Sequence, residues 1–223
     1  MKVTTDACLF GAWCAEEIMH STFPVKNVLD IGAGTGLLSL IIAQKNNMAT
    51  IDAVEIEKEA AAQASKNIAA SPWQDQIHLH TMDIRCFHPA LKYDCIISNP
   101  PFYENELISV DSKKNVAHHS THLELEPLLH FIKNNLTSTG TFYLLLPYKR
   151  KKEVENLCKK KELYIHKLVL VRQSVAHSYF RILIAGSIVK QPETETSELS
   201  VWNEQQQYTP EFVHLLKDYY LYL

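Results

Sequence analysis

The chain has 223 residues, of which 46% are hydrophobic and 21% charged, and its net charge at neutral pH is −3. This composition is typical of a globular protein of one domain, and it excludes a disordered or fibrous chain and a surface that is basic throughout. The apolar runs are too short to cross a bilayer, and the N-terminus lacks the apolar core of a signal peptide.

Short apolar runs alternate with helix-like segments along the first two thirds of the chain. Five strands are predicted, at residues 28–31, 49–55, 77–81, 93–98 and 141–146. Helices are predicted between them, at residues 37–45, 56–70 and 123–136. Because strands that alternate with helices form parallel sheets covered on both faces, the pattern predicts an α/β fold with such a sheet.

The last third of the chain departs from this alternation. A basic helix is predicted at 148–161, followed by two strands at 163–172 and 179–190, which leave no room for a helix between them and should pair antiparallel. Residues 191–200 are polar and are interpreted as a surface loop. Apolar residues at helical spacing in 209–223 predict a docked C-terminal helix that belongs to the same domain.

A glycine-rich turn follows the first predicted strand. Asp30 lies near the end of that strand, and Gly32, Gly34 and Gly36 precede the next helix. Glycines let a backbone approach a ligand without a Cβ clash, and the helix offers free N–H groups to a polar or anionic group. Alone, the motif is compatible both with ligand binding and with a plain tight turn.

Acidic residues follow the second and third predicted strands. Glu55 closes the second strand about 20 residues after the glycines, where an acid binds ribose hydroxyls. Asp83 follows the third strand, where it can accept a hydrogen bond from an adenine amino group while Ile84 packs on the ring; the alternative is a solvated loop acid. Because these features share the carboxyl edge of an open α/β sheet, they predict a nucleoside cofactor there.

The sequence Asn99-Pro100-Pro101-Phe102 follows the fourth predicted strand. Proline fixes φ and keeps the residue before it extended, so Asn99 is held rigidly at the sheet edge. The Asn99 side-chain oxygen and the Pro100 carbonyl can accept two hydrogen bonds from a planar amino group, and Phe102 offers a ring on which a base can stack. A proline turn that merely ends the strand is the alternative.

Together these motifs resemble those of class I S-adenosylmethionine-dependent methyltransferases that modify exocyclic or amide nitrogens. Other stretches resemble the bacterial tRNA1(Val) (adenine-37-N6)-methyltransferase family, among them 1–6, 9–13, 59–63, 71–73 and 97–102. The resemblance covers essentially the whole chain. It implies one Rossmann-like domain over residues 1–223, with a mainly parallel seven-stranded sheet, an antiparallel last strand and helices on both faces.

The resemblance also implies an activity, a cofactor and a set of site residues. The family methylates N6 of the adenine 3′ of the anticodon in a valine tRNA. S-adenosyl-L-methionine would be held by Lys2, Thr5, Asp30, Gly32, Gly34, Gly36, Glu55, Asp83, Ile84 and Asn99. Asn99 and Pro100 would bind the target amine and Phe102 the base, and residues 1–27 would close over the cofactor. A cytoplasmic monomer without metal is expected.

Basic residues and histidines raise two further hypotheses. The run that contains Lys149, Arg150, Lys151 and Lys152 is either a solvated helix face or a contact for RNA phosphates, and its place after a strand next to the proposed site favours RNA. His118, His119 and His122 follow the Asn-Pro-Pro-Phe motif without a cysteine or carboxylate partner, which favours a substrate loop over a metal site. The five cysteines lack Cys-x-x-Cys spacing, which argues against zinc and disulfides.

Two other functions remain open from the sequence. The same chemistry applies to other planar amino groups, namely guanine N2 in ribosomal RNA or a glutamine amide in a protein. A non-enzymatic alternative is a module that binds RNA or a nucleoside on a methyltransferase scaffold. The presence of both Asp30 and Asn99 argues against the second alternative.

Overall fold

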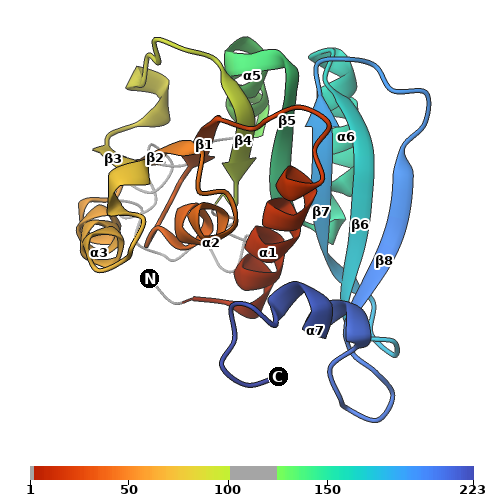
Figure 1. Cartoon of the computed structure of the whole chain (residues 1–223). Coiled ribbons are helices and arrows are strands. Elements are labelled where there is room, and N and C mark those ends of the chain that lie inside the picture. The colour runs from red at the N-terminus through yellow and green to blue at the C-terminus, as the bar shows by residue number, and fades with distance from the viewer. Residues whose placement is uncertain (1–2, 101–124) are drawn as a thin grey trace, which may run out of the picture.

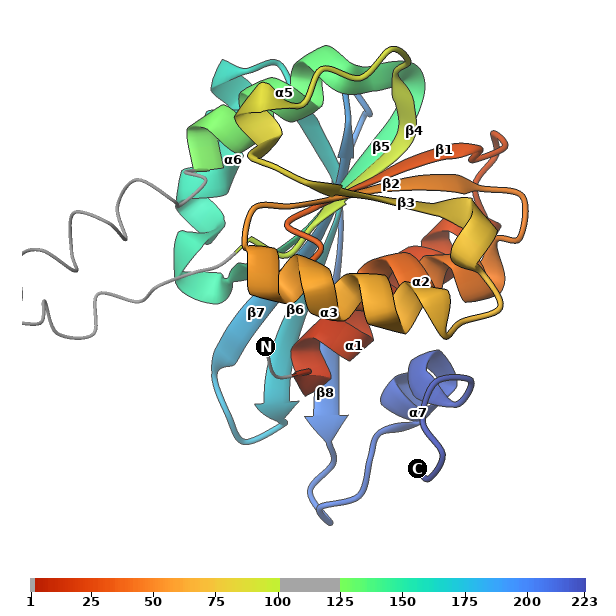
Figure 2. The ribbon, with the colours of Figure 1, turned by 90° about the vertical axis from the view of Figure 1, so that its left-hand side faces the viewer.

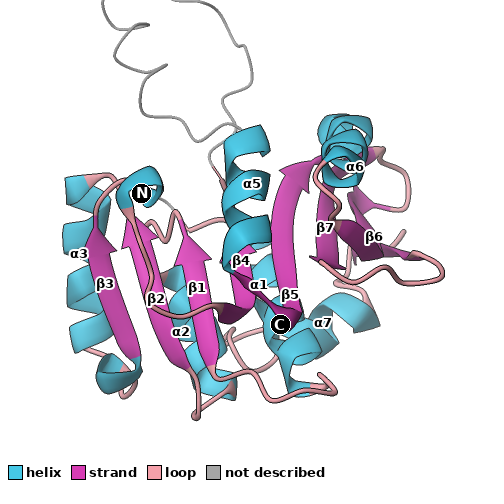
Figure 3. Ribbon diagram, turned by 90° about the horizontal axis from the view of Figure 1, so that it is seen from above, coloured by secondary structure: helices cyan, strands magenta, loops and turns pink. Residues whose placement is uncertain are grey.

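A computed structural model describes residues 3–100 and 125–223. In this part of the chain, eight strands form one sheet in the order β3-β2-β1-β4-β5-β7-β6-β8 (Figures 1 and 3). The strands are β1 Asn27–Ile31, β2 Thr50–Glu55, β3 Ile77–Thr81, β4 Tyr93–Ser98, β5 Leu136–Pro147, β6 Tyr164–Ser174, β7 Tyr179–Ser187 and β8 Glu195–Trp202. The α-helices are α1 Thr5–Met19, α2 Leu37–Lys45, α3 Lys58–Ala69, α5 Leu125–Asn135, α6 Lys151–Lys160 and α7 Pro210–Leu216.

Strand directions follow the predicted pattern. Strands β1 to β5 pair in parallel, as expected for strands joined by helical crossovers. The β6–β7 hairpin is antiparallel, as its short connection predicts, and β7 lies between β5 and β6. The α/β fold class inferred from the sequence is therefore confirmed.

The prediction of a surface loop at residues 191–200 is wrong. Residues Glu195–Trp202 form an eighth strand, β8, which pairs in parallel with β6 at the edge of the sheet. Its first half is exposed, and only Leu199 and Val201 in its second half are buried, so the apolar alternation is too short to be recognised. Within the described residues the sheet consequently has eight strands, where seven were predicted, and the last strand is parallel to its neighbour and not antiparallel.

Helices cover both faces of the sheet (Figure 2). Helices α1 and α2 bury Phe10, Cys14 and Ile42 in one hydrophobic cluster, and α5 buries Leu128 and Ile132 in the cluster on the other face. Because helices cover both faces of the sheet, the loops that follow the parallel strands lie together at the edge formed by the strand ends.

Most of the segment 1–27 forms helix α1, which the sequence analysis did not predict. The helix buries Leu9, Phe10 and Cys14, and Trp13 packs edge-on against Tyr143 with ring centroids 5.6 Å apart. It is thus a core helix. The suggestion that residues 1–27 close over a cofactor stays a prediction.

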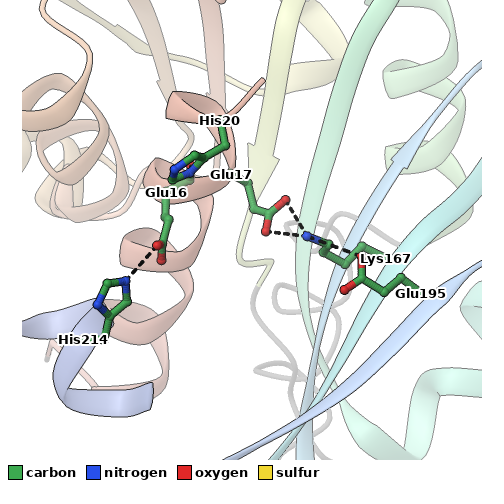
Figure 4. A network of polar contacts seen from close by, with 6 residues as sticks. All are labelled: Glu16, Glu17, His20, Lys167, Glu195 and His214. Carbon is green, nitrogen blue, oxygen red and sulfur yellow. Dashed lines mark hydrogen bonds and ion pairs between the residues drawn. The ribbon is translucent and has the colours of Figure 1, made fainter. Parts of the chain in front are cut away.

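Polar contacts connect α1 with the C-terminal part of the chain (Figure 4). Lys167 on β6 donates to both carboxylate oxygens of Glu17 at 2.8 and 3.0 Å, while Nε2 of His214 on α7 lies 2.9 Å from Oε1 of Glu16. Burial lowers the pKa of Lys167, but Glu17 and Glu195 outweigh this effect and raise the pKa above its usual value. Phe212 of α7 is fully buried, which confirms the docked C-terminal helix.

Candidate active site

The ends of β1, β2, β3 and β4 lie in register at one edge of the sheet. Ile31 of β1 pairs with Val54 of β2 on one side and with Ser98 of β4 on the other. Glu55 in turn pairs with Thr81 at the end of β3. The glycine turn, Glu55, the residues after β3 and Asn99 therefore emerge along the same edge, where open α/β sheets bind their ligands.

The turn after β1 requires its glycines. Gly32, Gly34 and Gly36 have φ angles of +74°, +58° and +82°, which side-chain-bearing residues rarely adopt. The N–H groups of Gly32 and Ala33 donate to the Val54 carbonyl at 2.9 and 3.1 Å, so the turn is fixed to β2. No heavy atom lies within 4 Å of the position that a Cβ on Gly32 would occupy, which leaves the backbone there open to a ligand.

Asp30 is fully buried beneath this turn. The N–H and hydroxyl groups of Ser39 donate to Oδ2 of Asp30 at 3.1 and 2.7 Å, which links the end of β1 to the first turn of α2. Among the described residues, Oδ1 is buried without a hydrogen-bond partner. Burial raises the pKa of Asp30 to about 7, although the hydrogen bonds from Ser39 lower it.

Glu55 supports the glycine turn from the neighbouring strand. Glu55 is 6% exposed, and its carboxylate oxygens accept hydrogen bonds from the N–H groups of Gly34 at 2.7 Å and Glu57 at 2.8 Å. Because a carboxylate has about four acceptor sites, further donors can still bind. The sequence predicted a ligand contact for Glu55 but not this support of the turn.

Asp83 is held by Arg85, which is not among the predicted site residues. The N–H of Arg85 donates to Oδ1 of Asp83 at 2.8 Å, and the Arg85 guanidinium pairs with the same carboxylate. These hydrogen bonds lower the pKa of Asp83. The only sequence signal was the spacing of two residues. Ile84, which the sequence analysis placed against a cofactor ring, is 6% exposed and packs in the core cluster with Val54.

Asn99 follows a strand end that is fixed to its neighbour. The Ser98 hydroxyl donates to the Ile31 carbonyl at 2.8 Å, and Ser98 is fully buried. Asn99 itself is half-buried and Pro100 is buried. Phe102, the predicted base-stacking residue, lies outside the described residues.

The start of α1 reaches the same region. Arg181, at the beginning of β7, donates through Nε to Oδ2 of Asp6 at 2.7 Å. Because Arg181 pairs with Pro147 at the end of β5, this ion pair holds the first turn of α1 near the carboxyl edge. Thr5 is exposed in that turn, and Lys2 lies outside the described residues.

The basic run continues from β5 along the same edge. It comprises a 3-10 turn, Tyr148–Arg150, and helix α6. Arg150 pairs with Glu153 at 2.6 Å and Lys151 with Glu155 at 2.6 Å, whereas Lys152 is exposed. Acids within the helix therefore offset part of the run's positive charge.

The described residues provide no metal centre. No group of three or more histidine, cysteine, aspartate or glutamate side chains in residues 3–100 and 125–223 is arranged to hold a metal ion. His118, His119 and His122 lie outside these ranges. The cysteines that the structure describes are free thiols.

Comparison with known proteins assigns this arrangement to a family. The model of the methyltransferase small domain matches residues 14–161. A tRNA1(Val) (adenine(37)-N6)-methyltransferase of Dyadobacter fermentans is 38% identical over 99% of this chain and 91% of its own. The protein of the same name from Aliivibrio salmonicida is 35% identical over the same shares. A crystal structure of a putative class I S-adenosylmethionine-dependent methyltransferase from Listeria monocytogenes has a TM-score of 0.62 at 15% identity, covering 88% of this chain and 65% of that one.

The buried carboxyl group of Asp30 should make stability depend on pH. Between the ordinary pKa of 3.8 and about 7, the unfolded chain releases this proton while the folded chain keeps it. The free energy of unfolding therefore falls as pH rises through this window. Asp30→Asn removes this titrating group. The free energy of unfolding of Asp30→Asn, minus that of the unmodified protein, should therefore increase by roughly 1–4 kcal/mol from pH 4 to pH 8.

Urea unfolding of both proteins at several pH values measures this difference. Asp75→Asn, which changes an exposed acid in the segment Gln74–Gln76, is the control and should show the pH profile of the unmodified protein. Parallel profiles for Asp30→Asn and the unmodified protein would contradict a raised pKa at Asp30.

Proposed function

The chain belongs to the tRNA1(Val) (adenine(37)-N6)-methyltransferase family, and on this basis we propose that it transfers a methyl group from S-adenosylmethionine to N6 of an adenine in a transfer RNA. The observation that carries the proposal is the register of Ile31, Val54 and Ser98, which gathers the glycine turn, Glu55 and Asn99 at one sheet edge. Methyl transfer requires the nucleoside cofactor and the planar amine to be bound next to one another, and this edge offers sites for both.

The residues of this edge fit the cofactor. Asp30 has a buried carboxylate oxygen without a partner among the described residues, Gly32 leaves its backbone uncovered, and Glu55 retains acceptor capacity for hydroxyl groups. In this proposal, Gly34, Gly36, Asp83, Ile84, Asn99, Thr5 and Lys2 complete the binding set. S-adenosylmethionine, when bound, supplies a methyl group that its sulfonium already activates.

Asn99 orients the amine that receives the methyl group. Its side-chain oxygen and the Pro100 carbonyl accept the two N–H groups of the adenine amine, which directs the nitrogen lone pair toward the methyl donor. Ser98, bonded to the Ile31 carbonyl, and the buried Pro100 hold Asn99 in place. Catalysis then comes from positioning, and the amine releases its proton after the attack, so no strong general base is required.

The basic run provides the contact with RNA phosphates. Lys149 and Lys152 are exposed, and Arg150 and Lys151 can exchange their glutamate partners for phosphate oxygens. We place the anticodon loop of a valine tRNA on this side, with adenine 37 at Asn99, and propose that a monomer acts. No helix in the described residues has the length and apolar character needed to cross a membrane.

Replacing Glu55 tests the cofactor site. Glu55→Ala removes the acceptor for hydroxyl groups and the support of Gly34, so the affinity for S-adenosylmethionine should fall by about 1–3 kcal/mol in calorimetric titration. Glu57→Ala, which changes an exposed acid two residues later, is the matched control. Unchanged affinity in Glu55→Ala would remove Glu55 from the cofactor site.

Replacing Asn99 tests the methyl transfer itself. Asn99→Ala removes an acceptor that acts on the bound substrate, so single-turnover methylation should slow by about 100-fold or more, equivalent to ~2.7 kcal/mol, while cofactor affinity stays nearly constant. The assay uses labelled cofactor with unmodified tRNA and identifies the modified nucleoside, which is expected to be N6-methyladenosine.

The exposed Asn47, in the turn between α2 and β2, gives the control variant Asn47→Ala for this assay. Near-normal turnover in Asn99→Ala would refute the proposed mechanism. A methylguanosine product would mean that the same methyl transfer to a planar amine takes place on guanine and not on adenine.

Neutralising the basic run tests the RNA contact. Changing Lys149, Arg150, Lys151 and Lys152 to glutamine should weaken tRNA binding and lower the slope of log affinity against log salt by roughly one per lost phosphate contact. Lys26→Gln with Lys92→Gln, two exposed lysines directly before β1 and β4 at the opposite edge of the sheet, is the control for loss of positive charge elsewhere, and it should leave the salt slope unchanged. An unchanged salt slope would mean that RNA binds elsewhere.

A further inference from the structure

Aromatic side chains gather where β5 ends and β7 begins, beyond the site described above. Tyr148 follows the last residue of β5, and Tyr179 is the first residue of β7. Their ring centroids are 5.4 Å apart with an interplanar angle of 47°. Tyr148 and the neighbouring Phe180 are each 37% exposed. Large aromatic side chains in this cluster are therefore partly open to solvent and not buried in the core.

The register of the sheet places this cluster close to Asn99. Ser98 pairs with Leu144 of β5, and Pro147 pairs with Arg181 of β7. Tyr148 therefore follows the end of the strand next to β4 and lies about three residues farther along the strand direction than Asn99, which corresponds to roughly 10 Å. Figure 2 shows the β6–β7 hairpin and the start of α3 on the same side of the sheet. The end of β5 and the start of β7, which carry the aromatic cluster, thus lie at the same edge of the sheet as the candidate active site.

Neighbouring strands hold Tyr179 in position. The guanidinium carbon of Arg172, on β6, lies 5.6 Å from the Tyr179 ring centroid. Residues of β8 hold the Arg172 side chain in turn. Its Nε donates to the Ser200 hydroxyl at 2.8 Å, and its Nη2 pairs with Glu198 at 3.2 Å. A hydrogen bond to Glu198 raises the pKa of Tyr179. The ring is therefore preorganised, and binding a ligand on it costs little side-chain entropy.

The chemistry around the rings suits single-stranded nucleic acid. The exposed Lys149 and Lys152 lie one and four residues after Tyr148, and the guanidinium carbon of Arg181 lies 5.3 Å from the centroid of the Phe180 ring. Aromatic faces beside cations bind unpaired bases by stacking while the cations contact phosphates. A bilayer or a protein partner would favour a broader apolar surface, whereas each of these rings has an arginine or lysine nearby in space or sequence.

We propose that Tyr148 and Tyr179 form a stacking site for an unpaired RNA base that lies near the methylated nucleotide in the bound strand. This inference rests on the proposed function, since it takes RNA as the substrate. The site holds a second base at a distance from Asn99, so it favours a single-stranded loop over a duplex, in which the bases remain stacked on one another. It thereby selects the structural context of the target adenine.

Binding measurements with two synthetic RNAs test the site. The probes are a single-stranded adenine-containing oligonucleotide and the same sequence in a duplex, titrated against the unmodified protein, Tyr148→Leu, Tyr179→Leu and Tyr148→Phe. We expect each leucine variant to bind the single strand about tenfold more weakly, and the phenylalanine variant to bind it normally because its ring is retained. Duplex binding should be equal in all four proteins.

The exposed Phe23, which precedes β1 at the opposite edge of the sheet, provides the matched control. Phe23→Leu also removes an exposed ring and should bind the single strand like the unmodified protein. If Tyr179→Leu unfolds, Tyr148→Leu still decides the question, because Tyr148 is exposed. Single-strand affinity that is unchanged in Tyr148→Leu, or equally reduced in Phe23→Leu, would overturn the stacking site.

A methylation assay on the same proteins separates this inference from the proposed function. With tRNA as substrate, the leucine variants should show a raised KM and a nearly unchanged kcat. If the unmodified protein methylates tRNA and the leucine variants keep its KM, the stacking site is refuted and the proposed function stands. If the unmodified protein methylates no tRNA but its binding to single strands depends on the rings, the proposed function is refuted and the stacking site stands.

Discussion

A carboxylate buried at the end of the first strand organises the edge of the sheet. Asp30 accepts two hydrogen bonds from Ser39, so β1, the glycine turn and the first turn of α2 form one rigid unit. Burial of a charge is costly, and the favourable end of the helix dipole offsets only part of that cost, as the raised pKa of Asp30 indicates. An apolar residue would pack there without this penalty, so the buried carboxylate fits the binding role proposed for it.

Glu55 complements Asp30 from the neighbouring strand. Asp30 fixes the turn to the helix behind it, and Glu55 fixes it to β2 by accepting the N–H of Gly34. The two carboxylates also repel one another, since the charge of Glu55 contributes to the raised pKa of Asp30. A positively charged hydrogen-bond donor near the turn would relieve the repulsion and would also give Oδ1 of Asp30 the partner that it lacks among the described residues. The edge therefore has an electrostatic preference for a cationic group before any ligand arrives.

The sequence allowed the parallel strands, the β6–β7 hairpin and the docked α7 to be predicted, because each has a continuous apolar pattern. It did not reveal β8, whose polar first half is exposed at the sheet edge. Nor did it reveal the pairing of Asp6 with Arg181, which are 175 residues apart, because a single sequence carries no signal for such contacts. The pairing of Arg150 with Glu153 was within reach, since residues three apart are neighbours on a helix surface.

The contacts between α1 and α7 have a consequence for biosynthesis. Glu16 meets His214 across 198 residues, and Gln44 of α2 donates to the carbonyl of Asp218 near the C-terminus. The N-terminal helices thus lack part of their cover until α7 and the residues after it have been synthesised. Strand β7 also separates β5 from β6, so the sheet cannot be completed in the order of translation. Until then the nascent chain exposes the apolar surface that these later elements cover, and surface of this kind is prone to aggregation.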